Sequence, residues 1–236
     1  MADGVAPRVI RQLKARKATR RCHPERDIYH SVPLRLFRLS FTLMDESVIA
    51  AIAKWPNVPA VFGWMALTAR GEWRLRGEPI ANQAICDFIG RNYTHDERGR
   101  WFFQNGPQRV FVDLEVTPWI WRVAAEPGAP LRSHTDRPAE RLHGAWLDES
   151  GRLFLQTDIG FGLLDSTDSG RAAGSFRMNG EREVAPDDLE AWLAGGDGRV
   201  VVSGALLGLE GNAALDRLLA DDAPRRFSYV RVPRPD

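Results

Sequence analysis

The sequence predicts an α+β fold, mostly antiparallel β-hairpins with a few short helices, in which one β-unit is duplicated. Short apolar strands alternate with turn signals, of which Asn179-Gly180 is the strongest two-residue hairpin signal. Segments with a helical apolar period are few and short. The sequence of residues 96–104 is echoed in register at residues 148–156, and this echo predicts the duplication.

The composition fits a globular protein with its own core. Of the 236 residues, 44% are apolar and 27% are charged, which are ordinary values for a folded domain. No apolar run approaches the roughly 20 residues that a membrane-spanning helix needs. Cys22 lies in a polar segment and Cys86 in an apolar helical pattern, so we expect no disulfide between them. We therefore expect a cytoplasmic protein.

Charge is distributed unevenly along the chain. Residues 1–26 hold eight Lys or Arg and two acidic residues, so the rest of the chain holds 24 of the 32 basic and 29 of the 31 acidic residues. Residues 1–43 are predicted to be a basic, largely disordered extension, with the folded protein beginning near Met44. Two explanations stay open: a translation start assigned too far upstream, or a basic tail that contacts RNA or an anionic membrane.

The first half of the folded chain is predicted to contain two helices and several hairpin strands. Asp45 is a good N-cap for a helix that ends at Pro56, and Gly90 ends a second helix. The residues predicted to face inward are Val48, Ile49, Ile52 and Trp55 in the first helix, and Ile85, Phe88 and Ile89 in the second. Strands are predicted at residues 61–68, 72–76, 100–104, 108–116 and 119–123.

Residues 124–141 contain three Pro and no aromatic residue, which makes them the best linker in the chain. They separate an N-terminal α+β subdomain, residues 44–123, from a C-terminal α+β subdomain, residues 142–236. In the latter, helices are predicted after Pro186 and around Leu215, Leu218 and Leu219. Its strands are predicted at residues 145–147, 152–156, 160–164, 176–178, 181–184, 200–202 and 227–232.

The echo between residues 96–104 and 148–156 keeps Asp, Glu, Gly, Arg, Phe and Gln in register, and Asp113 matches Asp165 further on. One interpretation is turn chemistry, in which Gly in the left-handed conformation leads into a strand. The other is a duplicated β-unit on either side of the linker. Both predict hairpins, and neither predicts catalysis.

No motif in the sequence identifies an enzyme. There is no phosphate-binding loop, dinucleotide fingerprint, nucleophile elbow or zinc-ligand spacing, so we expect no cofactor and no metal. His134-Thr135-Asp136 could orient a general base, but its position in the linker favours a solvent-exposed loop. His95-Asp96-Glu97 holds metal-ligating side chains, but a turn explains these residues more simply.

A donor-rich group in the first half is the candidate ligand-binding site. Short segments around one strand pair carry amide and guanidinium donors, and Arg offers a planar fork that suits a carboxylate or a phosphate. The alternative is that Asn and Gln shape turns while charged residues pair across strands. We predict that Arg109 lies beside Asn92, Tyr93 or Arg76 on a concave surface. The full set of candidate residues is Arg76, Asn92, Tyr93, Gln104, Asn105 and Arg109.

Several runs in the chain are not generic turn or strand patterns. They are Trp55-Pro56-Asn57-Val58-Pro59, Gly63-Trp64, Trp73-Arg74-Leu75-Arg76-Gly77-Glu78-Pro79-Ile80, Arg91-Asn92-Tyr93, Trp101-Phe102-Phe103-Gln104-Asn105-Gly106-Pro107-Gln108-Arg109-Val110, and the closing Phe227 with Arg231-Val232-Pro233-Arg234-Pro235. Through them the sequence, from about Met44 to the C-terminus, resembles a proteobacterial family known only as a domain of unknown function. The resemblance implies a cytoplasmic bacterial protein and brings no activity, cofactor or catalytic residue.

Three functions follow as hypotheses. The leading one is a non-catalytic binding or interaction module, whose unknown partner is a small anionic ligand or a protein. The alternative is an enzyme that acts on a small anionic substrate at a cleft near Arg76, Asn92, Tyr93 and Arg109. The abundant aromatic residues and the basic N-terminus raise nucleic acid as a third partner, and the acidic body argues against it.

Overall fold

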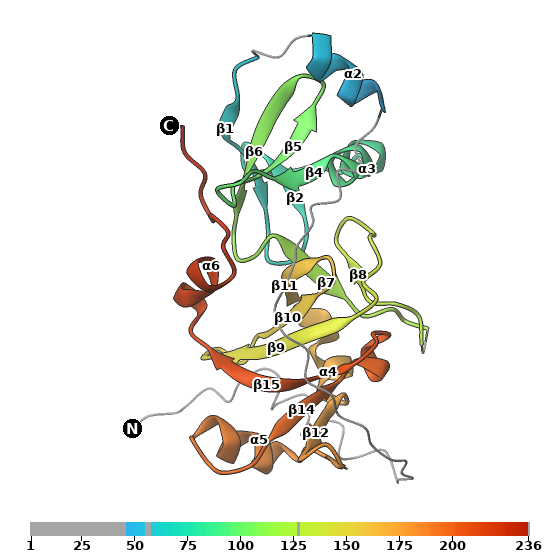
Figure 1. The fold of residues 1–236 in the computed structure, drawn as a ribbon, viewed down its shortest axis with the longest axis vertical. Helices are drawn as coiled ribbons and strands as arrows, with labels where there is room; N and C mark the ends of the chain where they lie inside the picture. The colour runs from blue at the N-terminus through green and yellow to red at the C-terminus, as the bar shows by residue number, and fades with distance from the viewer. Residues whose placement is uncertain (1–45, 55–57, 127, 236) are drawn as a thin grey trace.

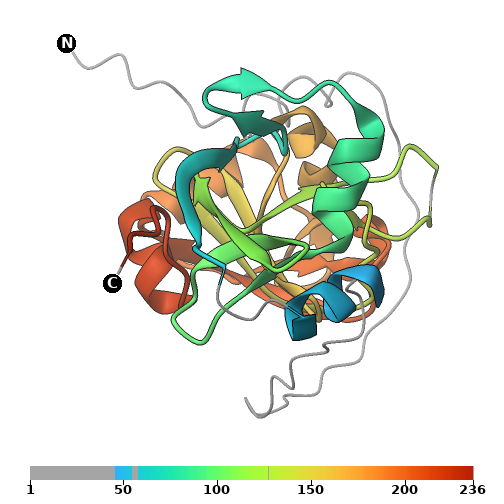
Figure 2. The ribbon, with the colours of Figure 1, turned by 90° about the horizontal axis from the view of Figure 1, so that it is seen from above.

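The computed structural model describes residues 46–54, 58–126 and 128–235 and confirms the predicted α+β class. The described chain forms two mixed, mostly antiparallel sheets of six and nine strands, with five short α-helices. The sheets lie one above the other along the long axis (Figure 1) and overlap when seen from above (Figure 2). We call the part around the six-stranded sheet the first lobe and the part around the nine-stranded sheet the second lobe. The predicted extension, residues 1–43, lies outside the described residues.

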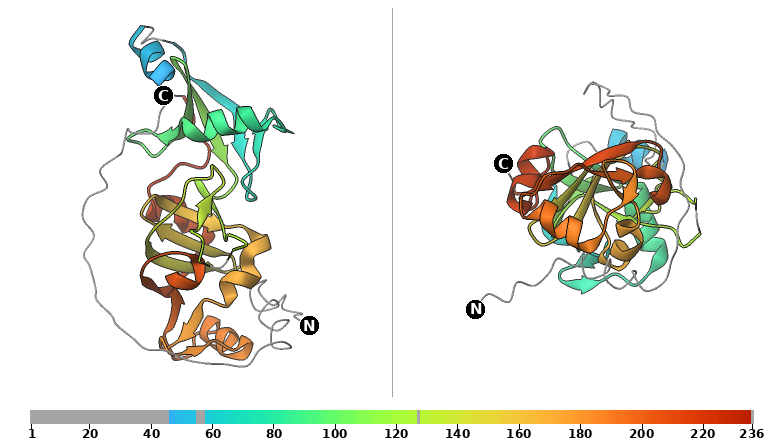
Figure 3. Two further views of the ribbon diagram at one scale, coloured as in Figure 1. Left: turned by 90° about the vertical axis from the view of Figure 1, so that its right-hand side faces the viewer. Right: turned by 90° about the horizontal axis from the view of Figure 1, so that it is seen from below.

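The first lobe has the strand order β3-β2-β1-β6-β5-β4, in which β1 and β6 are parallel and all other neighbours are antiparallel. Helix α3 lies across one face of the sheet (Figure 3, left), where Phe88 packs edge-on against Phe103. The elements are α2 (Glu46–Lys54), β1 (Val61–Leu67), β2 (Trp73–Leu75), β3 (Glu78–Pro79), α3 (Gln83–Arg91), β4 (Tyr93–His95), β5 (Trp101–Asn105) and β6 (Gln108–Leu114).

Both helices predicted for this lobe form, but they bury narrower faces than predicted. Ile89 of α3 and Val48 of α2 are buried. The prediction that Ile49 and Ile85 point inward is wrong, because these side chains are 51% and 47% exposed. A nine-residue helix at the periphery of a lobe buries a stripe rather than a whole side. Trp55 lies outside the described residues.

The second lobe has the strand order β13-β12-β14-β15-β9-β10-β11-β7-β8. Strands β15 and β9 are parallel, as are β7 and β11, and the remaining neighbours are antiparallel. Within the described ranges, no helix is long and apolar enough to cross a membrane. The elements are β7 (Trp119–Arg122), β8 (Arg132–Ser133), β9 (Leu142–Asp148), β10 (Leu153–Thr157), β11 (Gly160–Leu164), α4 (Ser169–Ala173), β12 (Phe176–Met178), β13 (Arg182–Glu183), α5 (Pro186–Leu193), β14 (Val200–Ser203), β15 (Asn212–Leu218) and α6 (Ala223–Arg226).

Two predicted elements of the second lobe are different in the structure. The segment with Leu215 and Leu218 is strand β15 instead of a helix, because pairing with β9 buries both side chains and outweighs local propensity. The predicted strand at residues 227–232 follows α6 as an irregular segment that returns to the first lobe (Figure 1). There the Val230 N–H donates to Gly99 O at 2.9 Å.

The cross-strand pairs of the first lobe recur in the second lobe 52 residues later. Phe102 pairs with Phe111 in the first lobe, and Phe154 pairs with Leu163 in the second. The residue pairs of the β4–β5 ladder also recur 52 residues later in the β9–β10 ladder, where Trp146 pairs with Phe154 as Thr94 pairs with Phe102. Strands β4, β5 and β6 thus form a meander in the first lobe, as β9, β10 and β11 do in the second. The last strand of each meander pairs with a parallel strand, β6 with β1 and β11 with β7.

The segment predicted as a linker packs between the lobes. Strand β8 lies within it, and Leu131 and Ala139 are fully buried. A Cβ added to Gly71 of the first lobe would lie 2.6 Å from the Cβ of His134, so the backbones make a close approach there. The expectation of a solvent-exposed loop around His134 is therefore wrong.

Candidate functional site

Two of the predicted site residues lie in the core. Tyr93 is fully buried, its hydroxyl donates to Pro118 O at 3.3 Å, and burial raises its pKa well above the ordinary value, while Arg137 has a smaller opposing effect. Asn92 is also buried and donates from Nδ2 to Phe88 O at 2.9 Å, which caps the end of α3. Both residues therefore have a structural role in the first lobe.

The strand register separates Tyr93 from Arg109. Tyr93 lies opposite Phe103, which lies opposite Val110, so these three share one face of the sheet. Arg109 is the next residue before Val110 and points to the other face, because successive side chains in a strand alternate. The structure therefore does not place Tyr93 and Arg109 around a common cleft.

Gln104 and Asn105 belong to the hairpin between β5 and β6. Gln104 is buried and donates from Nε2 to Gly106 O at 3.0 Å, and Gly106 has the left-handed φ of 55° that this turn needs. Asn105 is exposed and lies opposite Gln108 at the end of the ladder. These amides shape the turn that positions Arg109.

The face of the six-stranded sheet turned away from α3 carries three stacked arginine–aromatic pairs. The guanidinium of Arg76 lies 3.8 Å from the ring centroid of Trp64, that of Arg109 lies 4.9 Å from Phe102, and that of Arg100 lies 5.0 Å from Phe111. Phe62 stacks on Phe111 at 4.4 Å. We call this surface, with Trp64, Arg76, Phe102, Arg109 and Phe111, the arginine face.

Two guanidinium groups of the arginine face are open to ligand. Arg76 and Arg109 are exposed, and among the described residues neither forms an ion pair with a carboxylate. By contrast, Arg100 pairs with Asp96 at 2.7 Å, and Arg74 lies 3.6 Å from Glu72. The arginine face thus has two donor forks whose charge is not neutralised within the described part of the chain.

The carboxyl of Asp113 also lies on this side of the sheet. Asp113 and Arg74 both neighbour Ala66 across the strands, and Oδ1 of Asp113 is buried with no hydrogen-bond partner among the described atoms. Burial raises the pKa of Asp113, and the nearby Arg234 opposes that shift.

The pairing of Arg76 with Trp64 has only a weak signal in the sequence. Arg76 adopts a left-handed backbone with φ of 49°, which is uncommon for a residue other than Gly, and this turn brings its guanidinium back over β1. Phe62 and Trp64 alternate with the buried Met65 and Leu67, which indicates that both aromatic rings lie on the face of β1 opposite these two residues.

His134 and Arg137 form a second polar group, located between the lobes, that sequence reasoning assigned to a loop. The His134 ring lies against Trp73, Tyr93 and Trp119 at 5.0–5.8 Å, and its Nδ1 accepts from Ile120 N–H at 3.3 Å. Burial, with smaller effects from Arg122 and Arg137, lowers the pKa of His134 to about 3. The imidazole is therefore neutral near pH 7 and serves packing.

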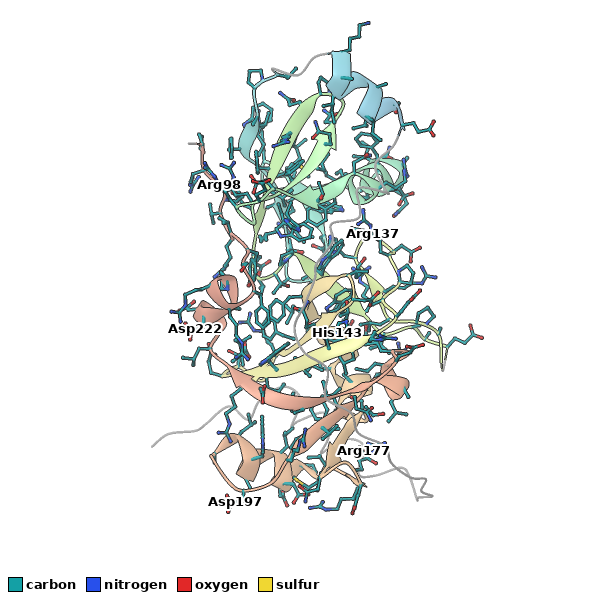
Figure 4. All side chains as sticks on the ribbon, viewed as in Figure 1. Arg98, Arg137, His143, Arg177, Asp197 and Asp222 are labelled. Atoms are coloured by element: carbon teal, nitrogen blue, oxygen red, sulfur yellow. The ribbon has the colours of Figure 1, made fainter. Side chains whose placement is uncertain are left out.

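Arg137 joins the lobes through the C-terminal end of α3. Its Nη2 donates to Gly90 O at 3.0 Å and to Arg91 O at 3.3 Å, and its guanidinium lies over Trp119. Figure 4 shows Arg137 at the junction of the two lobes. A cation is favourable here because the last carbonyls of a helix carry a partial negative charge.

The described residues show no metal-binding cluster. No three His, Cys, Asp or Glu side chains within the described ranges converge on a common point. Two adjoining open depressions that share Arg217 lie on the second lobe. Trp192 lines one of them and Arg226 the other.

Comparison with known proteins gives a family and two solved structures with partial similarity. The profile of a family described as "Protein of unknown function (DUF2946)" matches residues 44–234, which confirms the resemblance expected from Met44 onward. A DUF1285 family protein from Silicibacter pomeroyi DSS-3 is 16% identical, with a TM-score of 0.39 over 58% of this chain and 81% of that one. A DUF1285 family protein from Shewanella baltica OS155 is 15% identical, with a TM-score of 0.35 over 44% and 86%. The search of curated proteins found no match.

Proposed function

The chain belongs to the DUF2946 family of proteins of unknown function, and we propose that it is a non-catalytic binding module that takes an anionic ligand on the arginine face. One observation carries the proposal. Arg76 and Arg109 are exposed on one side of one sheet, each stacked on an aromatic ring and neither paired with a carboxylate of the described chain. An unneutralised pair of this kind favours a negatively charged partner.

The aromatic rings restrict the conformations of the two arginine side chains before a ligand binds. Stacking on Trp64 and Phe102 restricts the orientation of each guanidinium plane and adds a cation–π attraction of about 0.5–1 kcal/mol at an exposed site. The N–H groups along the edge of the plane stay free for a carboxylate or a phosphate oxygen pair. Restricting the side chain beforehand lowers the entropy lost on binding.

Binding rather than catalysis is supported by the positions of the perturbed titratable groups. Tyr93 and His134, whose pKa values are strongly shifted, both pack in the aromatic cluster between the lobes. An active site would hold such groups beside a space for the reacting atoms, whereas these two rings pack against Trp73 and Trp119. The proposal assigns them to packing and leaves the arginine face as a recognition surface.

We also propose that the two lobes contain two copies of one β-unit. The proposal is supported by the cross-strand pairs that recur 52 residues apart and by the echo between residues 96–104 and 148–156. The copies differ where binding is proposed, because Arg109 of the first corresponds to the buried Phe161 of the second. A superposition of residues 94–116 on 146–168 tests this part.

The test of the binding proposal measures the affinity of the full chain for two anionic polymers, polyglutamate and polyphosphate, at 0.15 M salt. The wild-type chain should bind at least one polymer. The Arg76→Gln, Arg109→Gln double variant should bind it roughly tenfold more weakly, since two exposed ion pairs contribute about 0.5–1 kcal/mol each. Arg225→Gln removes an exposed charge from the second lobe and should leave affinity unchanged. Equal binding by the folded double variant, or binding to neither polymer, would overturn the proposal.

A further inference from the structure

We propose that the partner of the arginine face is an acidic polypeptide segment, bound in an extended conformation with two acidic residues four positions apart. The inference rests on the proposed function and names the class of ligand. Its starting point is the second lobe, where the corresponding face of the sheet is already covered by a segment of this chain. The strand pairings relate Phe102 to Phe154 and Arg109 to Phe161, because the pair Gln104–Arg109 recurs as Gln156–Phe161.

In the second lobe, an aromatic segment closes the corresponding surface. Phe227 stacks on Phe161 with ring centroids 3.5 Å apart and packs edge-on against Trp146 at 4.9 Å. Tyr229 lies 6.3 Å from Phe161, so Phe161 is only 5% exposed. A polypeptide segment therefore covers this face of the second-lobe meander. Both the face and the segment that covers it present aromatic side chains to each other.

In the first lobe, the equivalent surface carries charge where the second lobe has a ring. Arg109 is exposed at the position of the buried Phe161, and Arg76 adds a second guanidinium on the same side of the sheet. By charge complementarity, the segment that suits this surface is acidic. Trp64, 47% exposed beside Arg76, offers an apolar contact to the same segment.

The separation of the two arginines distinguishes a polypeptide from a small anion. Arg76 follows β2 and Arg109 lies in β6, with β1 between them, which gives about 10 Å across the strands. Along the strands, the register offsets their backbone positions by roughly two residues, or about 7 Å, so the backbone positions lie ~12 Å apart. Their guanidinium groups lie over Trp64 of β1 and Phe102 of β5, which are two strand spacings apart, or about 10 Å. A single phosphate or carboxylate reaches one of the two forks. An extended segment places side chains four residues apart on one side at about 13 Å.

Charge density favours a polypeptide over a nucleic acid. Outside residues 1–26 the chain holds 29 acidic residues against 24 basic ones, and a polynucleotide carries a negative charge at every phosphate. A peptide with two acidic residues matches the two open forks without bringing further negative charge close to an acidic body. The observations therefore favour an acidic peptide.

The experiment measures fluorescence anisotropy of labelled probes with the full chain at 0.15 M salt. The first probe is a heptapeptide with Glu at its second and sixth positions and Thr elsewhere, which we call the spaced peptide. The second, the adjacent peptide, has the same composition with Glu at its second and third positions, and the third probe is a single-stranded hexathymidylate. The spaced peptide should bind at least fivefold more tightly than the adjacent peptide. Arg109→Gln should remove that difference, Arg109→Lys should restore part of it, and Arg225→Gln should have no effect.

The outcomes separate this inference from the broader proposal. If the hexathymidylate binds through Arg76 and Arg109 while neither peptide does, the acidic-peptide inference is wrong and the anion-binding face stands. Equal binding of the two peptides, with the same sensitivity to Arg109→Gln, would overturn the extended two-point geometry. Failure of all three probes, together with both polymers above, would overturn the inference and the proposed function.

Discussion

Asp96 and Asp148 close two turns in different sheets with the same set of hydrogen bonds. In each, Oδ1 accepts the backbone N–H groups two and four residues ahead at 2.8–3.0 Å. Oδ2 accepts from Nε of Arg100 in the first turn at 2.7 Å and of Arg152 in the second at 2.6 Å. Each turn therefore depends on one carboxylate, which also fixes the arginine that follows it.

The first prediction compares these two carboxylates. Asp148 has no exposed side-chain surface, whereas the Asp96 side chain is 12% exposed. Asp148→Ala leaves three donors without their acceptor in a buried setting and should lower the free energy of unfolding by about 2–3 kcal/mol. Asp96→Ala should cost less, because water replaces part of the lost bonding. Urea unfolding of both variants checks the order, and a larger loss for Asp96→Ala would contradict it.

The second prediction concerns the pH dependence of stability. His134 has a pKa of about 3 in the folded chain, against an ordinary value near 6.5. Between these values the unfolded chain binds a proton that the folded chain does not, so stability falls as pH drops from about 6.5 towards 3. The slope from this residue reaches about 1.4 kcal/mol per pH unit. The slope is about half of this at pH 6.5 and disappears about one pH unit above it.

His134→Gln isolates this contribution. The substitution removes the titration, so the loss of stability that it causes at pH 8 should shrink as unfolding is measured at pH 6, 5 and 4. If the difference in unfolding free energy between variant and wild type stays constant over this range, the pKa of His134 is the same in the folded and the unfolded chain.

The third prediction tests the packing of the lobes through two glycines with similar backbones. Gly71 and Gly77 have φ of 76° and 89°, so Ala is strained at both positions. A Cβ at Gly71 meets His134 Cβ at 2.6 Å, whereas a Cβ at Gly77 meets nothing within 4 Å. Gly71→Ala should therefore lower the melting temperature clearly more than Gly77→Ala. Equal shifts would mean that the lobes do not pack closely at Gly71.

The fourth prediction concerns Arg137 as the connection between lobes. Arg137→Lys keeps the charge but loses the guanidinium Nη2 that donates to both Gly90 O and Arg91 O, and we expect a loss of about 1–2 kcal/mol in unfolding free energy. Arg132→Lys, at an exposed ion pair with Asp136, is the matched control and should change stability by less than about 0.5 kcal/mol. Similar losses for both would contradict the proposed role.

Local patterns predicted the parts of the fold that local chemistry determines. The hairpin at Asn179-Gly180 and the two echoed turns were predictable, because turn residues fix the backbone without help from distant segments. Strand β15 was not, since its pairing with β9 brings together residues about 70 positions apart and outweighs a helical apolar spacing.

The candidate site was predicted in part for the same reason. Arg76 and Arg109 stand out as exposed donors on short segments, and both lie on the arginine face. Asn92 and Tyr93 carry the same kinds of polar group, but tertiary packing places them in the core, where burial decides their role. The packing of His134 between the lobes was not predictable, because the Pro-rich sequence around it carries no signal for a contact with the other lobe.

The arginine face is tested most directly by the arginine side-chain signals in an NMR titration of the full chain with the spaced peptide. The Nε–Hε signals are assigned from spectra of Arg76→Lys and Arg109→Lys. We predict that these two signals shift together and saturate at one dissociation constant, while the signal of Arg225 stays in place. If the peptide binds and the signals of Arg76 and Arg109 do not move, the arginine face is not the binding surface.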